Sequence, residues 1–190
     1  MKAQRMVRVL GAALALGLIV SGCGGGGGGS SNRVTVSGDA NFPVANGGQP
    51  VAEAPFVIID PDRSTDPLLS DVSTEDGRYF GIIRKTVSVA VILSGNVGGE
   101  DIRVSGLIPA ESNNDGKQLD GRTDIACEAG VQAVIDGDIT GNELDAQRIQ
   151  NLEDAATRFV ATTDFTDPAS VTASANQVRA LTNNGERPAP

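Results

Sequence analysis

Phe56-Val57-Ile58-Ile59 decides the class of fold, because four consecutive apolar residues suit a strand that is buried on both faces. Asp60-Pro61-Asp62 follows and ends the strand, since proline donates no ladder hydrogen bond and aspartate favours turns. Upstream, Val34-Thr35-Val36-Ser37 alternates between apolar and polar residues, as in a strand with one buried face. The first half of this 190-residue chain is therefore predicted to be β-structure.

Further strands are predicted downstream of this run. Residues 87–93 and 101–105 alternate with a period of two. Between them and the first strands lies Thr74-Glu75-Asp76-Gly77-Arg78-Tyr79, whose Asp-Gly pair is typical of a type I′ hairpin turn. Short strands bounded by Gly, Pro, Asp and Asn indicate a small antiparallel β-sandwich, which we expect over residues 33–107.

Three segments of this region carry a pattern in a fixed order: V-T-V-S-G at 34–38, Q-P-V-A-E-A-P-F-V at 49–57 and T-E-D-G-R-Y-F at 74–80. Together they resemble the carboxypeptidase regulatory-like domain over about residues 33–93, under half of the chain. The resemblance implies a seven-stranded, transthyretin-like sandwich with a binding or spacer role and no catalytic residues. The connection between the first two segments is longer than the family pattern.

Beyond Pro109 and a polar loop at 111–117, the apolar period changes to 3.6, and about three helices are predicted within residues 119–183. The first covers about 123–136, with Thr123 as its N-cap. The second covers about 141–161, after a capping box of Thr140 and Glu143. The third covers about 168–182, and residues 184–190 are expected to form a frayed tail. The fold class is therefore α+β, a small antiparallel β-sandwich followed by C-terminal helices that pack on it.

The N-terminal residues 1–22 have the order of a signal peptide. Three bases precede an apolar run at 9–20, which is shorter than the ~20 residues that span a bilayer. Val20-Ser21-Gly22-Cys23 resembles the lipobox of bacterial lipoproteins, which implies cleavage before Cys23 and lipidation of its thiol, with palmitate among the acyl chains. An ordinary secretory signal with a chance cysteine, or a short membrane anchor, is the alternative. Residues 23–32 are predicted to be a flexible Gly/Ser tether.

The position after the cysteine indicates the membrane. In the lipoprotein family an aspartate there retains the protein at the inner membrane, and this chain has Gly24 instead. The resemblance therefore implies the outer membrane of a bacterial cell envelope.

The composition excludes several functions. From Cys23 onward the chain keeps 24 acidic residues against 12 bases, a net charge of −12, so nucleic acid is not an expected partner. The absence of histidine removes the commonest general base and metal ligand. Cys127 is the one cysteine left after the anchor, and its helical spacing to Val131 and Val134 predicts a position in the core. A redox or nucleophilic thiol and a disulfide to a partner are the alternatives.

Two acidic segments are weak candidates for calcium, because carboxylate oxygens are its usual ligands. Asp136, Asp138 and Thr140 fit the first half of an EF-hand loop, but Glu143 and Gln147 stand where an aliphatic residue and a bidentate glutamate belong. The second segment holds Asp60, Asp62, Asp66 and Asp71. The alternatives are an acidic turn with a helix cap and a solvated loop, respectively.

We therefore expect a lipid-anchored envelope protein that acts as a non-catalytic binding or structural module. Its partners would be the membrane, through the lipid on Cys23, and an unidentified envelope or extracellular protein. One alternative is a calcium-responsive adhesion or envelope module, and calcium is the one cofactor considered. The other is a carboxylate-dependent hydrolase, although the spacing of the 24 acids selects no catalytic pair.

Overall fold

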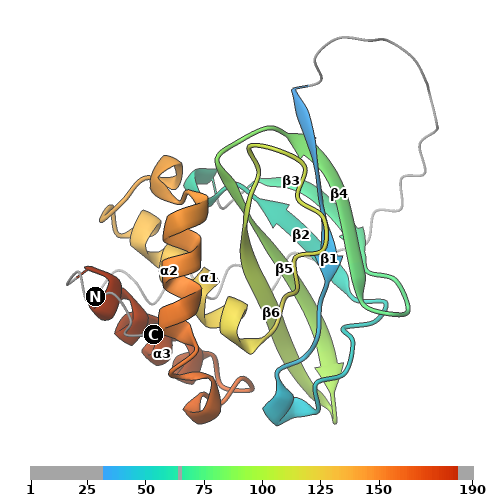
Figure 1. The fold of residues 1–190 in the computed structure, drawn as a ribbon. Helices are drawn as coiled ribbons and strands as arrows, with labels where there is room; N and C mark the ends of the chain where they lie inside the picture. The colour runs from blue at the N-terminus through green and yellow to red at the C-terminus, as the bar shows by residue number, and fades with distance from the viewer. Residues whose placement is uncertain (1–31, 64–65, 184–190) are drawn as a thin grey trace. The chain divides into compact units, whose positions relative to one another are not determined.

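The computed structural model describes residues 32–63 and 66–183, which form two antiparallel sheets followed by three helices (Figure 1). The larger sheet has the order β3-β2-β5-β6, and the smaller sheet pairs β1 with β4. The strands are β1 (Arg33–Asp39), β2 (Pro55–Ile59), β3 (Pro67–Val72), β4 (Arg78–Arg84), β5 (Ser88–Val97) and β6 (Glu100–Pro109). The helices are α1 (Gly121–Ile135), α2 (Ala146–Ala156) and α3 (Pro168–Asn183). The predicted α+β class is confirmed.

The inner faces of the two sheets form the first part of the core. Tyr79 of β4 meets Phe56 of β2 edge to face, with ring centroids 6.3 Å apart. Gly81 lets β4 approach β2 closely, since a Cβ there would lie 2.6 Å from Cδ1 of Ile58. The apolar run at 56–59 is thus the centre of the sandwich, with Phe56, Ile58 and Ile59 buried and Val57 half-buried.

The predicted polar loop after β6 runs alongside β1. Val36 bridges in parallel to Asn114, and Ala40 bridges to Leu119. The backbone N–H of Ser37 donates to the carbonyl of Asn114 at 3.0 Å. The described residues form six strands rather than the seven that the family resemblance implies, and this segment extends the smaller sheet beyond β1.

The hairpin prediction at Asp76-Gly77 is wrong. The strands on either side of that turn, β3 and β4, belong to different sheets, and only Gly77 of the pair has a positive φ, 77°. A two-residue hairpin does join β5 to β6, at Gly98 and Gly99, with φ of 64° and 95°. Two consecutive positive φ values are those of a type I′ turn, which glycine adopts without steric cost.

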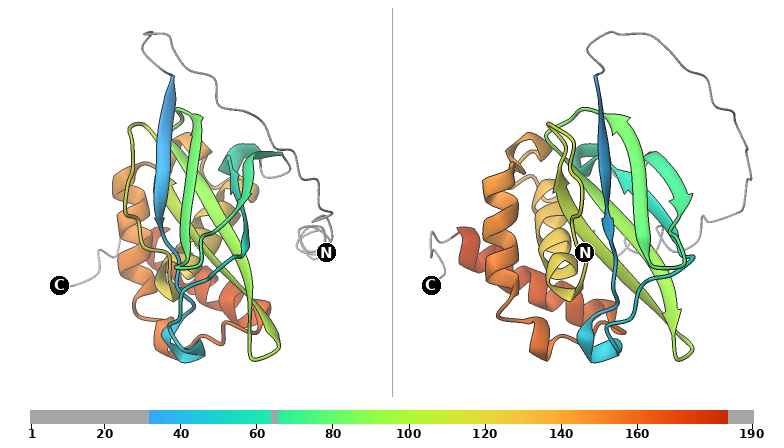
Figure 2. Two further views of the ribbon diagram at one scale, coloured as in Figure 1. Left: turned by 90° about the vertical axis from the view of Figure 1, so that its right-hand side faces the viewer. Right: turned by 45° about the vertical axis from the view of Figure 1, so that its right-hand side comes forward.

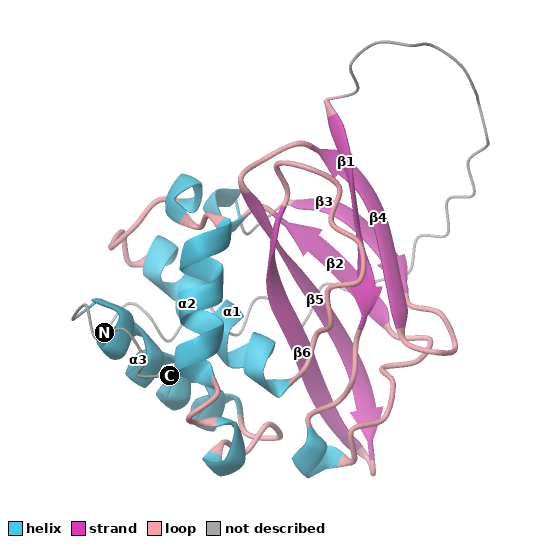
Figure 3. Ribbon diagram, viewed as in Figure 1, coloured by secondary structure: helices cyan, strands magenta, loops and turns pink. Residues whose placement is uncertain are grey.

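The helices lie on one side of the strands, with α1 against β6 (Figures 2 and 3). Gly130 permits this contact, because a Cβ on it would lie 2.5 Å from Cδ1 of Leu107 and 3.2 Å from Cδ1 of Leu152. Residues from the strands and from all three helices belong to one hydrophobic core. None of the helices in residues 32–63 and 66–183 is long and apolar enough to cross a membrane.

The predicted helices exist, but two of their starts differ, and α2 ends at Ala156 rather than near residue 161. The N-cap of α1 is Asp120, and Thr123 occupies position N3 of its capping box instead of the cap. Asp145 caps α2, so the box of Thr140 and Glu143 belongs to a short 3₁₀ helix, Gly141–Glu143. Both aspartates accept hydrogen bonds from the free N–H groups of the first turn, which is why they stop the helix from extending further back.

Candidate functional site

The predicted lipidation residue, Cys23, lies outside the described residues. The predicted calcium residues lie within them, and the structure engages most of them with protein partners. Asp136 and Asp138, at the end of α1, both contact the guanidinium of Arg179 on α3, at 2.9 and 2.6 Å. These two ion pairs join the C-terminal end of α1 to α3. The carboxylates therefore already have a cation, supplied by the chain itself.

The second acidic segment contacts the first, although some 80 residues separate them. The backbone N–H of Gly141 donates to Oδ1 of Asp62 at 2.8 Å. Asp60 accepts from the backbone N–H of Asp62 at 3.0 Å, while Asp66 is exposed. Thr140 is occupied by its capping interaction, since its N–H donates to Glu143 at 2.8 Å. The two segments thus form one junction between the sandwich and the helical region.

Within the described part of the chain, no three Asp, Glu or Cys side chains are gathered so that they could hold a metal ion. The calcium sites stay predictions, and calorimetry with millimolar calcium is their direct test.

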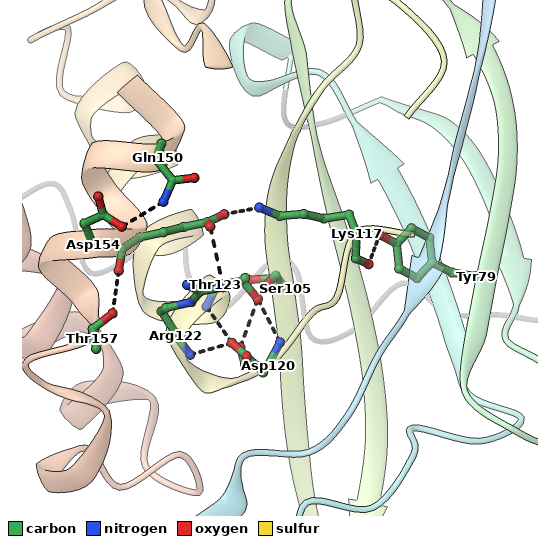
Figure 4. A network of polar contacts seen from close by, with 10 residues as sticks. Tyr79, Ser105, Lys117, Asp120, Arg122, Thr123, Gln150, Asp154 and Thr157 are labelled. Atoms are coloured by element: carbon green, nitrogen blue, oxygen red, sulfur yellow. Dashed lines mark hydrogen bonds and ion pairs between the residues drawn. The ribbon is translucent and has the colours of Figure 1, made fainter. Parts of the chain in front are cut away.

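A network of charged and polar side chains around one buried carboxylate lies between the helices and the strands (Figure 4). Glu153 of α2 is 2% exposed. Its carboxylate binds Nζ of Lys117, which belongs to the segment beside β1, and contacts Arg122 of α1 at 3.8 Å. The backbone carbonyl of Lys117 in turn accepts from the hydroxyl of Tyr79 at 2.8 Å. This chain of contacts, the Glu153 network, runs from α2 to β4.

The start of α1 is fixed beside that network. Oδ1 of Asp120 accepts from the N–H groups of Arg122 and Thr123, at 2.9 and 3.0 Å. The hydroxyl of Thr123 donates to the carbonyl of Ser105 in β6 at 2.9 Å. The capping box of the helix is therefore also its attachment to the sheet.

A second buried group, the Asp124 cluster, joins α1 to β6. Asp124 accepts from the hydroxyl of Ser105 at 2.5 Å and lies 3.7 Å from Nε of Arg103. Arg103 also binds Glu128 at 2.7 Å. Burial raises the pKa of the Asp124 carboxyl, and the nearby Arg103 guanidinium opposes that shift. Ser105 and Asp124 are both buried, so a substrate could not reach this pair without a rearrangement of α1.

Cys127 lies next to the same cluster and is free and buried, as predicted. Burial raises the pKa of its thiol to about 12. Since the thiolate is the nucleophile, we expect this cysteine to be unreactive near neutral pH in the folded chain. The rest of its predicted apolar face is less buried, because Val131 and Val134 are half-buried and Ile135 is exposed.

Sequence reasoning overlooked both buried groups, although a signal for each was present. Glu153 occupies the position i+4 in the apolar stripe that begins at Ile149 and includes Leu152. Asp124 lies three residues before Cys127, on the face that is predicted to be buried. A carboxylate on an otherwise apolar helix face indicates a buried ion pair. The partners, Lys117 and Arg103, could not be found from spacing because they come from distant segments.

Large hydrophobic side chains are exposed on both sheets of the sandwich. Among the described residues, four of the six exposed large hydrophobic side chains belong to β3 and β4: Leu68, Val72, Phe80 and Ile82. The side chains of β4 alternate strictly between buried and exposed, and Phe80 and Ile82 lie on its outer face. This strand is the candidate binding surface of the domain, because exposed apolar groups that gather on one element are typical of interaction sites.

No protein-family model matches this sequence, and no curated protein matches it either. The resemblances to the lipobox and to the carboxypeptidase regulatory-like domain therefore rest on the quoted residues and stay predictions.

Proposed function

We propose that this chain is a lipid-anchored protein of the bacterial cell envelope, whose folded domain acts as a non-catalytic binding or structural module. One observation carries the proposal, which is Val20-Ser21-Gly22-Cys23 between a signal-like apolar run and six glycines. A lipid on Cys23 would fix the chain to the bilayer, since each buried CH₂ adds roughly 0.8 kcal/mol of membrane affinity. The glycines would let the domain move relative to that anchor.

The described domain supports the non-catalytic part of the proposal. The charged groups of the Glu153 network form ion pairs with one another between the helices and the strands, and so do those of the Asp124 cluster. Charges used in this way hold elements together, and the exposed row on β4 is available for a partner. The proposed role is therefore to present one face of a small domain at the membrane.

Fatty-acid labelling tests the anchor. The full chain would be expressed in a bacterium that is fed an alkyne analogue of palmitate, and labelled protein would be detected after gel separation. We expect label on the wild-type chain and on Cys127→Ala, and none on Cys23→Ser. Cys127 is the matched control because it is the other cysteine of the chain. Equal labelling of the Cys23→Ser variant would refute the lipid anchor.

The proposed location has its own test. If Gly24 directs the lipidated chain to the outer membrane, Gly24→Asp should move it to the inner-membrane fraction of a density gradient. Protease treatment of intact cells then separates the two faces of the outer membrane. Loss of the chain indicates an outward-facing domain, and survival until the envelope is opened indicates a periplasmic one. A Gly24→Asp variant that fractionates like the wild type would contradict the outer-membrane assignment.

A further inference from the structure

One edge of β4 has free backbone hydrogen-bonding groups. The N–H of Lys85 donates to the carbonyl of Asn32 at 3.0 Å, and β1 and β4 continue in this register with Ile83 opposite Val34. In an antiparallel pair, hydrogen-bonded and non-hydrogen-bonded positions alternate. The groups of Ile83 therefore point toward β1, and those of Ile82 point to the other side.

The same alternation places the backbone groups of Phe80 and Arg84 on that far edge. Thr35 and Ser37 of β1 lie opposite Ile82 and Phe80, and their backbone groups bond to the segment at 113–117, on the side of β1 away from β4. No strand within residues 32–63 and 66–183 pairs with β4 other than β1. The edge thus offers the donors and acceptors of three residues to an incoming strand.

The side chains along this edge define what could pair with it. Phe80 and Ile82 are 57% and 51% exposed. Arg78 and Arg84 are also exposed and occupy the two ends of the strand, and Arg33 lies opposite Arg84 on β1. Arg78 lies near two acids, Asp39 at 3.6 Å and Asp76, whose pKa it helps to lower, whereas no ion pair in the described part of the chain involves Arg84 or Arg33. In a strongly acidic chain, this face is therefore basic at the Arg84 end and apolar in the middle.

A second copy of the chain does not suit this edge in the register centred on Gly81. Antiparallel pairing of two β4 strands about Gly81 would place Arg78 opposite Arg84 at both ends, and like charges directly opposite destabilise a strand pair. β3, one of the two edge strands of the larger sheet, carries Pro67 and the acid Asp71, and its pairing with β2 is irregular at Ile58/Ile59. Proline, charge and bulges are the usual devices that keep an edge from pairing. The β4 edge lacks a proline and a bulge, and its charges are basic.

We propose that the free edge of β4 binds an extended, acidic segment of a partner protein by strand addition. The partner's backbone would complete the hydrogen bonds of Phe80, Ile82 and Arg84, its apolar side chains would cover Phe80 and Ile82, and its acids would face Arg78 and Arg84. This proposal specifies the partner class for the binding role proposed above and rests on that role, but not on the lipid anchor.

The register defines a probe. In the capped peptide Glu-Thr-Val-Thr-Ile-Thr-Glu, every second side chain faces the outer surface, so that the two acids meet Arg84 and Arg78 and the two apolar residues meet Ile82 and Phe80. The matched control peptide has lysine in place of both glutamates. Binding to the chain 24–190, which contains every described residue, would be followed by amide NMR shifts and amide exchange.

We expect the acidic peptide to bind about tenfold more tightly than the lysine peptide, because two cross-strand charge pairs change from attractive to repulsive. Exchange protection should appear at the amides of Phe80, Ile82 and Arg84. Arg84→Glu should reduce or reverse the preference, while Arg158→Glu, an exposed charge on the helical side of the molecule, should leave it unchanged.

Four results would overturn the proposal: equal affinity for the two peptides, shifts or protection away from β4, no saturable binding at several millimolar, or self-association of the free chain through this edge. Because the assay uses unlipidated chain, its failure leaves the anchor standing, and a failed labelling experiment leaves this edge unaffected.

Discussion

Replacement of Glu153 by glutamine would leave Lys117 and Arg122 facing a neutral amide inside the domain. Removal of one partner from a buried ion pair costs about 3–5 kcal/mol. Glu153 is buried, but the side chains of Lys117 and Arg122 are 21% and 38% exposed. Both cations can therefore recover part of their hydration, and we expect a loss of about 2–3 kcal/mol in the free energy of unfolding. For a domain of this size the melting temperature would fall by about 5–10 °C.

Urea denaturation of the chain 24–190, followed by circular dichroism, measures this loss. Asp154→Asn is the matched control, because Asp154 is the next residue of α2 and is exposed. It accepts a hydrogen bond from Gln150 at 2.7 Å, so its replacement should change stability by about 0.5 kcal/mol or less. Both substitutions remove one negative charge, so the difference between their stability losses measures the effect of burial.

A double variant distinguishes the contribution of the ion pair from that of side-chain packing. Lys117→Met with Glu153→Leu removes both charges and keeps apolar volume, and such replacements are often neutral or stabilising. It should therefore be more stable than Glu153→Gln alone. The reasoning is refuted if Glu153→Gln costs no more than Asp154→Asn, since the Glu153 network would then contribute nothing to the attachment of α2.

Three further predictions follow from close contacts and buried titrating groups. Gly38→Ala should cost at least about 3 kcal/mol by urea denaturation, because its Cβ would lie 1.9 Å from the carbonyl oxygen of Lys117 and 2.6 Å from the hydroxyl of Tyr79; a loss below 1 kcal/mol would contradict this packing. Asp124→Asn should alter the dependence of stability on pH. Above the ordinary pKa of 3.8 the carboxyl ionises first in the unfolded chain, so the wild type should lose stability relative to the variant as pH rises, until the folded carboxyl also ionises. If the difference in unfolding free energy between wild type and variant does not change with pH, burial does not raise this pKa. The Cys127 thiol should resist maleimide at pH 7.5 in the folded chain and react quickly in urea, with the adduct followed by mass spectrometry. Rapid reaction of the folded chain would contradict the burial of this thiol.

Local patterns were enough to find most of the elements. The period-two stretches at 34–37 and 87–93 lie in β1 and mostly in β5, and the run at 56–59 lies in β2. The 3.6-residue stripes located all three helices, with α3 within a residue of its expected bounds. These signals work because one buried face imposes its period on the residues of a single element. They fail at element ends, where Asp120 and Asp145 show that the cap which binds the first-turn N–H groups sets the start.

The turns show which features local sequence predicts and which depend on long-range strand pairing. Asp76-Gly77 has hairpin chemistry, yet it joins strands of different sheets, whereas Gly98-Gly99 forms the two-residue hairpin of β5 and β6. Each pair permits a sharp reversal, but the sheet that the next strand enters depends on which partners are free. The pairing of the predicted polar loop with β1 was missed for the same reason, since it is made by the backbone and leaves no apolar period.

The sequence by itself determined the class of this protein: a β half and a helical half, a signal-like start with a lipobox resemblance at Cys23, and a chain without histidine. Those features are local or compositional, so they can be read without a fold. Tertiary structure alone decided that Lys117 meets Glu153, that Arg103 meets Asp124, and that β4 keeps a free edge between two arginines. These depend on which distant segments pack together, because burial and strand pairing are properties of neighbours in space and leave no period along the chain.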